Sequence, residues 1–223
     1  MNIQSGVVYA WFVLFGMGVV VLAMLLDLDA QNLSIFFATY LLADAGSYLF
    51  HYIVDHYGNA ARQGIVREFQ NHHAQPGYIA QRPLVEVIYP AAKIITLPVL
   101  VVLLLALAGW IPGAWALFLF TLGSCWVFTQ VFHRWAHLRR PGRLVSLLQR
   151  TGLILGSTAH DRHHESPFMT DFAVINGWTN PLFDAIDMPG LVDIVLEKGL
   201  GIEKRSTLVA DMAAMQLENR QSV

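Results

Sequence analysis

The stretch "VVYAWFVLFGMGVVVLAMLL", residues 7–26, contains no charged side chain and is long enough to cross a bilayer as a helix. No Lys or Arg precedes it, its apolar run is longer than that of a secretory signal, and no small-residue cleavage site follows, so we interpret it as a membrane span. Comparable apolar stretches occupy residues 33–54, 88–110 and 112–132. The sequence therefore predicts an all-α, multi-pass membrane protein with about four transmembrane helices.

The composition agrees with this class. Of 223 residues, 55% are hydrophobic and 13% are charged, with a mean hydropathy of +0.48, whereas soluble domains carry about 25% charged residues. The formal net charge of −2 and the pI of about 6.5 give no indication of a nucleic-acid partner. Cys125 is the single cysteine, which excludes an intramolecular disulfide, and its apolar surroundings favour a small buried hydrophobic residue.

Charge predicts the orientation in the membrane. Four spans place both termini on one side, and the two opposite turns, "DLDAQN" and "GWIPG", contain neither Lys nor Arg. All 14 basic residues, from Arg62 to Arg220, fall on the side of the termini or near it, which the positive-inside rule assigns to the cytoplasm. Residues 144–159 are apolar but short and broken by Arg150, which favours an interfacial or re-entrant helix over a fifth span.

We see no internal repeat or low-complexity linker, so we expect residues 1–223 to form a single domain. Residues 188–223 are expected to be a cytoplasmic tail, in which "STLVADMAAMQLENR" has the pattern of one amphipathic helix.

The histidines are not spread along the chain. All nine lie between positions 51 and 164, in the groups "FHYIVDHYG", "NHHAQP", "FHRWAHL" and "STAHDRHHESP". In the last group, His160, His163 and His164 stand at helical spacings of three and four, which places three imidazoles on one helix face. Span parity puts all four groups at the same cytoplasmic face. Each imidazole carries ring nitrogens that need partners, so hydrophobic packing does not explain such a cluster. The pattern therefore indicates metal binding.

One further polar stripe lies on the second predicted span. Asp44, Tyr48, His51 and Asp55 are spaced by four, three and four residues, so they share a helix face. Asp44 lies mid-span, where a carboxylate either serves a functional site or bonds a neighbouring helix. Asp55 stands where an HxxxH pair would place its second ligand, and a carboxylate can replace imidazole on iron.

The candidate metal ligands outnumber the needs of one ion, because a zinc site uses about four protein ligands. Two metals fit better, and imidazole with an occasional carboxylate suits iron, zinc, copper or nickel. Iron would support oxygen activation, whereas zinc would support hydrolysis, and the donor types alone leave both open. Gln130, one turn before His133, is a possible supporting donor. The nine candidates are His51, Asp55, His72, His73, His133, His137, His160, His163 and His164.

Four ordered motifs resemble a known family. They are the HxxxD element in "FHYIVDHYG", the HH element "FQNHHAQP", the HxxxH element "HRWAH", and "HDRHHESP" followed by "INGWTNPLFD". Over residues 45–187 this pattern resembles the lipid desaturase family that includes plasmanylethanolamine desaturase and the plant plastid phosphatidylglycerol desaturase. The resemblance implies a diiron site that uses the nine candidates. His56 departs from the family pattern and its role is open, and Asn180 is either a further contact to metal or a turn residue before Pro181.

The resemblance also implies an activity. The expected reaction is the O2-dependent introduction of a double bond into a membrane lipid, either an alkyl ether chain, as in plasmalogen synthesis, or a fatty acyl chain. The sequence contains no GxGxxG nucleotide-binding fingerprint, so we expect electrons to come from a separate donor such as ferredoxin or a small haem protein. Two alternatives stay open: a diiron lipid hydroxylase, and a non-redox zinc membrane protein such as a hydrolase. A transporter would need its ligands near the bilayer midplane, whereas these candidates are expected at one membrane face, which argues against transport.

Overall fold

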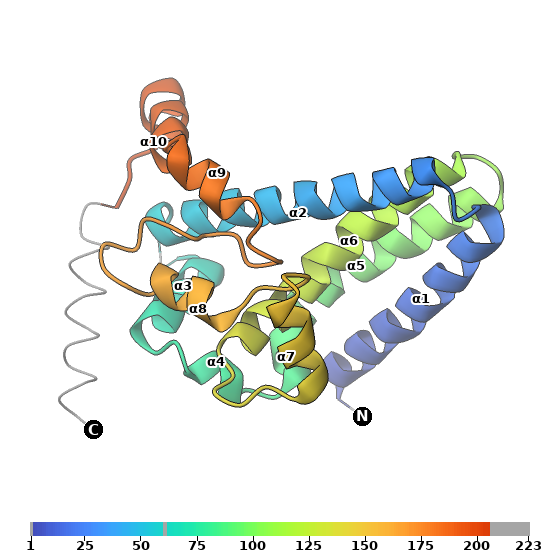
Figure 1. Ribbon diagram of the computed structural model, residues 1–223, viewed down its shortest axis with the longest axis horizontal. Helices are drawn as coiled ribbons and strands as arrows, with labels where there is room; N and C mark the ends of the chain where they lie inside the picture. The colour runs from blue at the N-terminus through green and yellow to red at the C-terminus, as the bar shows by residue number, and fades with distance from the viewer. Residues whose placement is uncertain (1, 60–61, 206–223) are drawn as a thin grey trace. The chain divides into compact units, whose positions relative to one another are not determined.

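The computed structural model describes residues 2–59 and 62–205, and over these ranges it is helical and contains no strand (Figure 1). Its four longest helices are apolar enough to cross a membrane. They are α1 (Ile3–Leu25), α2 (Ala30–His56), α5 (Leu84–Leu107) and α6 (Gly113–Ala136). These helices coincide with the four predicted spans to within about four residues at each end, a difference of the size at which helix ends commonly vary. The prediction of an all-α, multi-pass membrane protein is therefore confirmed.

The remaining helices are short. They are α3 (Gly64–Ala74), α4 (Tyr78–Gln81), α7 (Arg143–Arg150), α8 (Ser157–His163), α9 (Asn180–Ala185), α10 (Met188–Asp193) and the π-helix η1 (Ile194–Gly199). The prediction of one helix over residues 144–159 is wrong. Helix α7 ends at Arg150, and Gly152 follows with a left-handed φ of +70°, a conformation that breaks a right-handed helix. The predicted amphipathic helix at 206–220 lies outside the described residues.

The chain divides into two compact units. Unit 1 comprises residues 1–43 and 82–131, and unit 2 comprises residues 44–81 and 132–223. Helices α2 and α6 each contribute residues to both units. All nine candidate metal ligands belong to unit 2. The single-domain organisation predicted for residues 1–223 stays a prediction.

Unit 1 is held together by small and aromatic residues. The ring of Phe15 on α1 stacks on Phe120 of α6 with centroids 5.6 Å apart, and it meets Phe128 edge-on at 5.0 Å. Gly18, one turn further along α1, lies directly against the ring of Phe120, so that an added methyl group would collide with it. Glycine at this position lets the two helices approach closely, as small residues do in membrane-helix interfaces.

Replacing Gly18 with valine should therefore destabilise the helix packing by about 1–3 kcal/mol, the usual cost of an overpacked interface. Gly16 is a matched control, because it is exposed on the same helix and has no neighbouring atom within 4 Å of an added Cβ. Unfolding of the detergent-solubilised variants by SDS titration measures the difference. Equal stabilities for Gly18→Val and Gly16→Val would contradict this packing.

Unit 2 contains an aromatic core beside the candidate ligands. Tyr48 and Tyr52 of α2 are fully buried against Phe172, with ring centroids 5.2 and 5.1 Å away. Phe172 belongs to a segment that runs from the end of α8 to the start of α9 without regular secondary structure. This segment is buried from Asp171 to Asn176, so it forms part of the interior of unit 2.

Candidate metal centre

The structure brings all nine predicted ligands together, in two groups. In each group, one ligand atom per residue lies within 4.8 Å of every other. The five-histidine group consists of His72, His133, His137, His160 and His164, and the Asp55 group consists of His51, Asp55, His73 and His163. Histidines that are adjacent in the sequence belong to different groups. His72 and His164 belong to the five-histidine group, and His73 and His163 belong to the Asp55 group. Each HH doublet therefore supplies one imidazole to each group.

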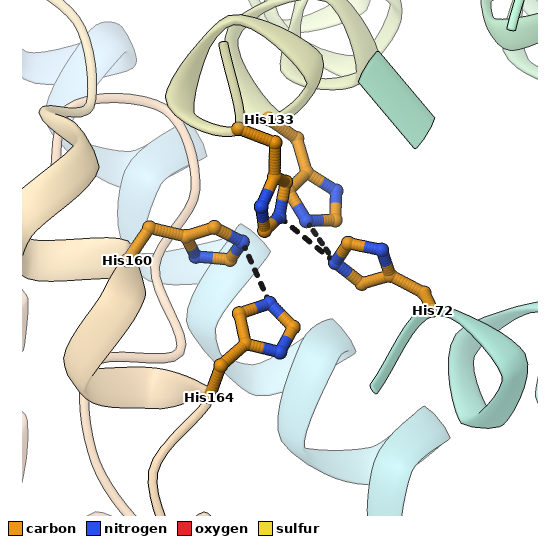
Figure 2. Close-up of side chains that lie close together, drawn as sticks. His72, His133, His160 and His164 are labelled. Atoms are coloured by element: carbon orange, nitrogen blue, oxygen red, sulfur yellow. Dashed lines mark hydrogen bonds between the residues drawn. The ribbon is translucent and has the colours of Figure 1, made fainter. Parts of the chain in front are cut away.

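Three elements supply the five-histidine group: α3, the end of α6 with the residue after it, and α8 with the residue after it. The Nε2 atom of His72 lies 2.9 Å from Nε2 of His133 and 3.1 Å from Nε2 of His137. The Nε2 atoms of His160 and His164 are 3.2 Å apart. Figure 2 shows the labelled rings pointing toward a common centre from these different elements.

The Asp55 group is arranged around one carboxylate oxygen. The Nε2 atom of His73 lies 2.9 Å from Oδ2 of Asp55, and the Nε2 atoms of His51 and His163 each lie 3.4 Å from it. His51 and Asp55 are one helical turn apart on α2, so the predicted i, i+4 pair is formed. All four residues are buried to within 1% exposure.

Backbone carbonyls orient two histidines of the Asp55 group. The Nδ1–H of His51 donates to the carbonyl of Phe172 at 3.0 Å, and the Nδ1–H of His163 donates to the carbonyl of Thr170 at 2.9 Å. A proton held on Nδ1 leaves Nε2 with its lone pair, which faces Asp55 in both residues. This pattern is typical of metal-binding histidines, whose second nitrogen is fixed by a carbonyl or carboxylate.

Burial keeps four imidazoles of the five-histidine group neutral. It lowers the pKa of His72, His160 and His164 well below the usual 6.5, and neighbouring histidines lower it further. Burial also lowers the pKa of His137, to about 3. A neutral imidazole carries the lone pair that a metal ion needs, so these four histidines are in a metal-binding form at neutral pH.

The donor set fits two metal ions. With metal–nitrogen bonds of about 2.1 Å, ligand nitrogens at right angles would be about 3.0 Å apart, close to the separations of 2.9–3.2 Å in the five-histidine group. Several polar atoms of the cluster, including Nε2 of His51 and Oδ1 of Asp55, are buried and form no hydrogen bond within residues 2–59 and 62–205. Buried polar atoms normally have a partner, and a bound cation would supply one.

Asp44 makes structural contacts. Its buried carboxylate accepts hydrogen bonds from the backbone N–H groups of Asn176, Gly177 and Thr179, and from the Thr179 hydroxyl, at 2.7–3.0 Å. These bonds satisfy the carboxylate and fix the segment that leads into α9. Of the two roles considered for Asp44, the contacts favour the structural one.

Three other residues lie outside both groups. The amide oxygen of Asn180 accepts from the Ala173 N–H at 2.8 Å, a loop contact, and its role at metal stays a prediction. His56 is buried, and its Nε2 lies 3.4 Å from the carbonyl of Phe168. Gln130 belongs to unit 1, and its supporting role stays a prediction.

Sequence reasoning missed the orienting carbonyls of Thr170 and Phe172. It also missed the ion pair between Arg162 and Asp171, in which the guanidinium donates to both carboxylate oxygens at 2.8 and 2.9 Å. Every residue has a backbone carbonyl, so the pattern of residue types cannot show which carbonyls orient a histidine. The position of Arg162, within a run of five ligand and acidic residues at 160–165, was the available signal.

The comparisons with known proteins agree with the motifs. A family model described as the lipid desaturase domain matches residues 40–207. The chain is 30% identical over 175 residues to fatty acid desaturase 4, chloroplastic, of Arabidopsis thaliana, covering 76% of this chain and 53% of that protein. It is 34% identical over 149 residues to plasmanylethanolamine desaturase of Myxococcus xanthus, covering 63% of this chain and 52% of that protein.

The chain spans about half the length of these curated relatives. A third relative, plasmanylethanolamine desaturase 1 of Mus musculus, is 29% identical over 153 residues, covering 63% of this chain and 55% of that protein. No solved structure matches the chain. The family match covers well over half of the chain and includes all nine candidate ligands, which confirms the resemblance inferred from the motifs. The chain belongs to the lipid desaturase family.

Proposed function

We propose that this protein is a diiron lipid desaturase that introduces a double bond into the alkyl ether or fatty acyl chain of a membrane lipid. The observation that carries the proposal is the separation of nine ligands, seven of them buried, into two groups, each large enough for one ion. Membership of the lipid desaturase family supplies the reaction class, and four apolar helices place the protein in the bilayer that contains such a lipid.

The proposed reaction converts two adjacent methylene groups, O2, two electrons and two protons into a cis or trans double bond and two water molecules. Bound iron would supply the activation of O2 that removes the two hydrogens. The eight histidines and Asp55 would hold the two ions, and the carbonyls of Thr170 and Phe172 orient the rings of His51 and His163 for binding. Burial of the ligands excludes water from the reacting centre.

The competing functions differ in the metal and in the product. A hydrolase with a single zinc uses about three protein ligands and an open position, whereas nine ligands in two groups exceed that need. A diiron hydroxylase would use the same ligands, so the ligand set does not separate it from a desaturase. The relatives named above are desaturases of fatty acids or of plasmanylethanolamine, which favours desaturation over hydroxylation.

We further propose that the metal centre and the termini face the cytoplasm, because the basic residues gather on that side. A soluble electron donor, such as ferredoxin or a small haem protein, could then reach the centre from water while the lipid enters from the bilayer.

Purified protein in lipid vesicles should be inactive with O2 alone and should gain activity when a reduced ferredoxin or small haem protein is added. Mass spectrometry of the lipids should then show a product lighter by two hydrogens, because desaturation removes two hydrogens and adds no oxygen. Vesicles without the protein, and vesicles incubated without O2, are the controls. A product heavier by one oxygen would identify a hydroxylase, and turnover without O2 would exclude both diiron functions.

A further inference from the structure

The segment that orients the Asp55 group passes through one unusual residue. Asp171 stands between Thr170 and Phe172, whose carbonyls accept the Nδ1 protons of His163 and His51. Its φ is +58°, in the left-handed region that residues other than glycine adopt rarely, although aspartate tolerates it better than most. Such a conformation persists only where surrounding contacts enforce it.

Those contacts come from three helices. The Asp171 carboxylate is paired with both Nε and Nη2 of Arg162 on α8. The Asp171 N–H donates to Oδ2 of Asp184 on α9 at 3.3 Å, and Oδ1 of Asp184 accepts from the hydroxyl of Tyr48 on α2 at 2.7 Å. Asp171 itself is only 5% exposed. A bidentate ion pair with a planar guanidinium also fixes the orientation of the carboxylate, which a single hydrogen bond does not.

The two groups differ in how they are oriented. In the Asp55 group, His51 and His163 have carbonyl partners for Nδ1. In the five-histidine group, the Nδ1 atoms of His72 and His160 are buried and have no hydrogen-bond partner in the part of the chain that the structure describes. The carbonyl support next to Asp171 therefore serves one group and not the other.

We propose that Asp171 and Arg162 are positioning residues, which lock the Thr170–Phe172 segment so that its carbonyls hold His51 and His163 ready to bind the ion of the Asp55 group. Arg162 directly precedes His163, so the ion pair joins the ligand-bearing helix α8 to the carbonyls that orient its own ligand. The proposal rests on the proposed function in that it takes the Asp55 group as an iron site.

The test uses Asp171→Ala and Asp171→Asn, with Asp187→Ala as a matched control. Asp187 is also an aspartate in a left-handed conformation, with φ +50°, but it caps α10 by accepting from the Gly190 N–H and belongs to neither ligand group. Both alanine variants therefore place alanine in a strained conformation and remove a carboxylate. They differ in whether that carboxylate supports the ligand-orienting carbonyls.

The first measurement is the binding of Fe²⁺ to the metal-free, full-length protein without O2. Loss of a partner that orients a metal ligand costs about 10- to 100-fold in affinity. We expect a loss of that size for Asp171→Ala at one of two ions, with the other ion unaffected. Asp171→Asn keeps the shape and the left-handed tolerance but weakens the ion pair, so its loss should be smaller. Asp187→Ala should bind both ions as the wild type does.

The second measurement is ¹⁵N NMR of the histidine rings in the metal-free protein. In the wild type, His51 and His163 should carry their protons on Nδ1. Asp171→Ala should shift both toward a mixture of tautomers, whereas Asp187→Ala should not. A purely structural role for Asp171 would not change the tautomers of these two histidines selectively.

Unchanged tautomers and two tightly bound ions in both Asp171 variants would overturn the proposal. Equal loss of both ions from a folded Asp171 variant would also overturn it, because the effect would then not be specific to the Asp55 group. If Asp171→Ala does not fold, Asp171→Asn still decides the question. A wild-type protein that binds two ions but forms no unsaturated lipid would refute the proposed function and leave the positioning role standing, whereas failure to bind Fe²⁺ would refute both.

Discussion

Replacement of His73 or His164 by alanine is expected to reduce lipid desaturation to background, a loss of more than about 100-fold, because the partners that merely orient metal ligands are already worth 10- to 100-fold. His73 belongs to the Asp55 group and His164 to the five-histidine group, so the two variants test the groups separately. Expression and membrane insertion should persist, since hydrophobicity of the spans drives insertion. Product formation in vesicles, normalised to inserted protein, measures the effect.

His56→Ala is the control for these variants. His56 is buried, as His73 is, but it lies in neither group and packs its ring on Tyr52 and Phe172, with centroids 4.6 and 5.9 Å away. Its removal loses packing and no ligand, so substantial activity should remain. If His56→Ala were as inactive as His73→Ala, the assignment of Asp55 as the ligand of the first motif would be wrong or incomplete.

The protein purified from iron-replete cells is expected to contain about two iron ions per chain, because each group offers as many ligands as one ion needs. Chelation should remove them together with the activity, and Fe²⁺ added back should restore both. Elemental analysis gives the stoichiometry. One zinc per chain and no iron would contradict the diiron proposal and favour the zinc hydrolase.

The iron content of two variants tests the two groups separately. His73→Ala removes one of four ligands from the Asp55 group, so it should retain about one iron per chain. His164→Ala leaves four of five histidines in its group, which is enough for an ion to bind, though more weakly. Two tightly bound irons in His73→Ala would mean that His73 is not a ligand.

Some features of this protein followed from the sequence because they depend on local chemistry. Four long, predominantly apolar stretches can avoid unsatisfied backbone groups in a bilayer only as helices, which determined the fold class. Helical periodicity placed His51 and Asp55 one turn apart. The number of spans predicted that four histidine groups would lie at one membrane face, and imidazole and carboxylate donors in that number indicated metal.

Other features required the tertiary structure because they depend on where distant segments meet. Helical periodicity makes the adjacent side chains of His72 and His73 point in different directions, but it does not show which residues each one meets. Only the packing of the surrounding helices supplies each with its partners. The sequence left both a functional and a structural role open for Asp44, and the structure supplies its hydrogen-bond donors from residues more than 130 positions away. Every residue has a backbone carbonyl, so the sequence does not show which carbonyls orient a histidine. Only the path of the backbone brings those of Thr170 and Phe172 to His163 and His51.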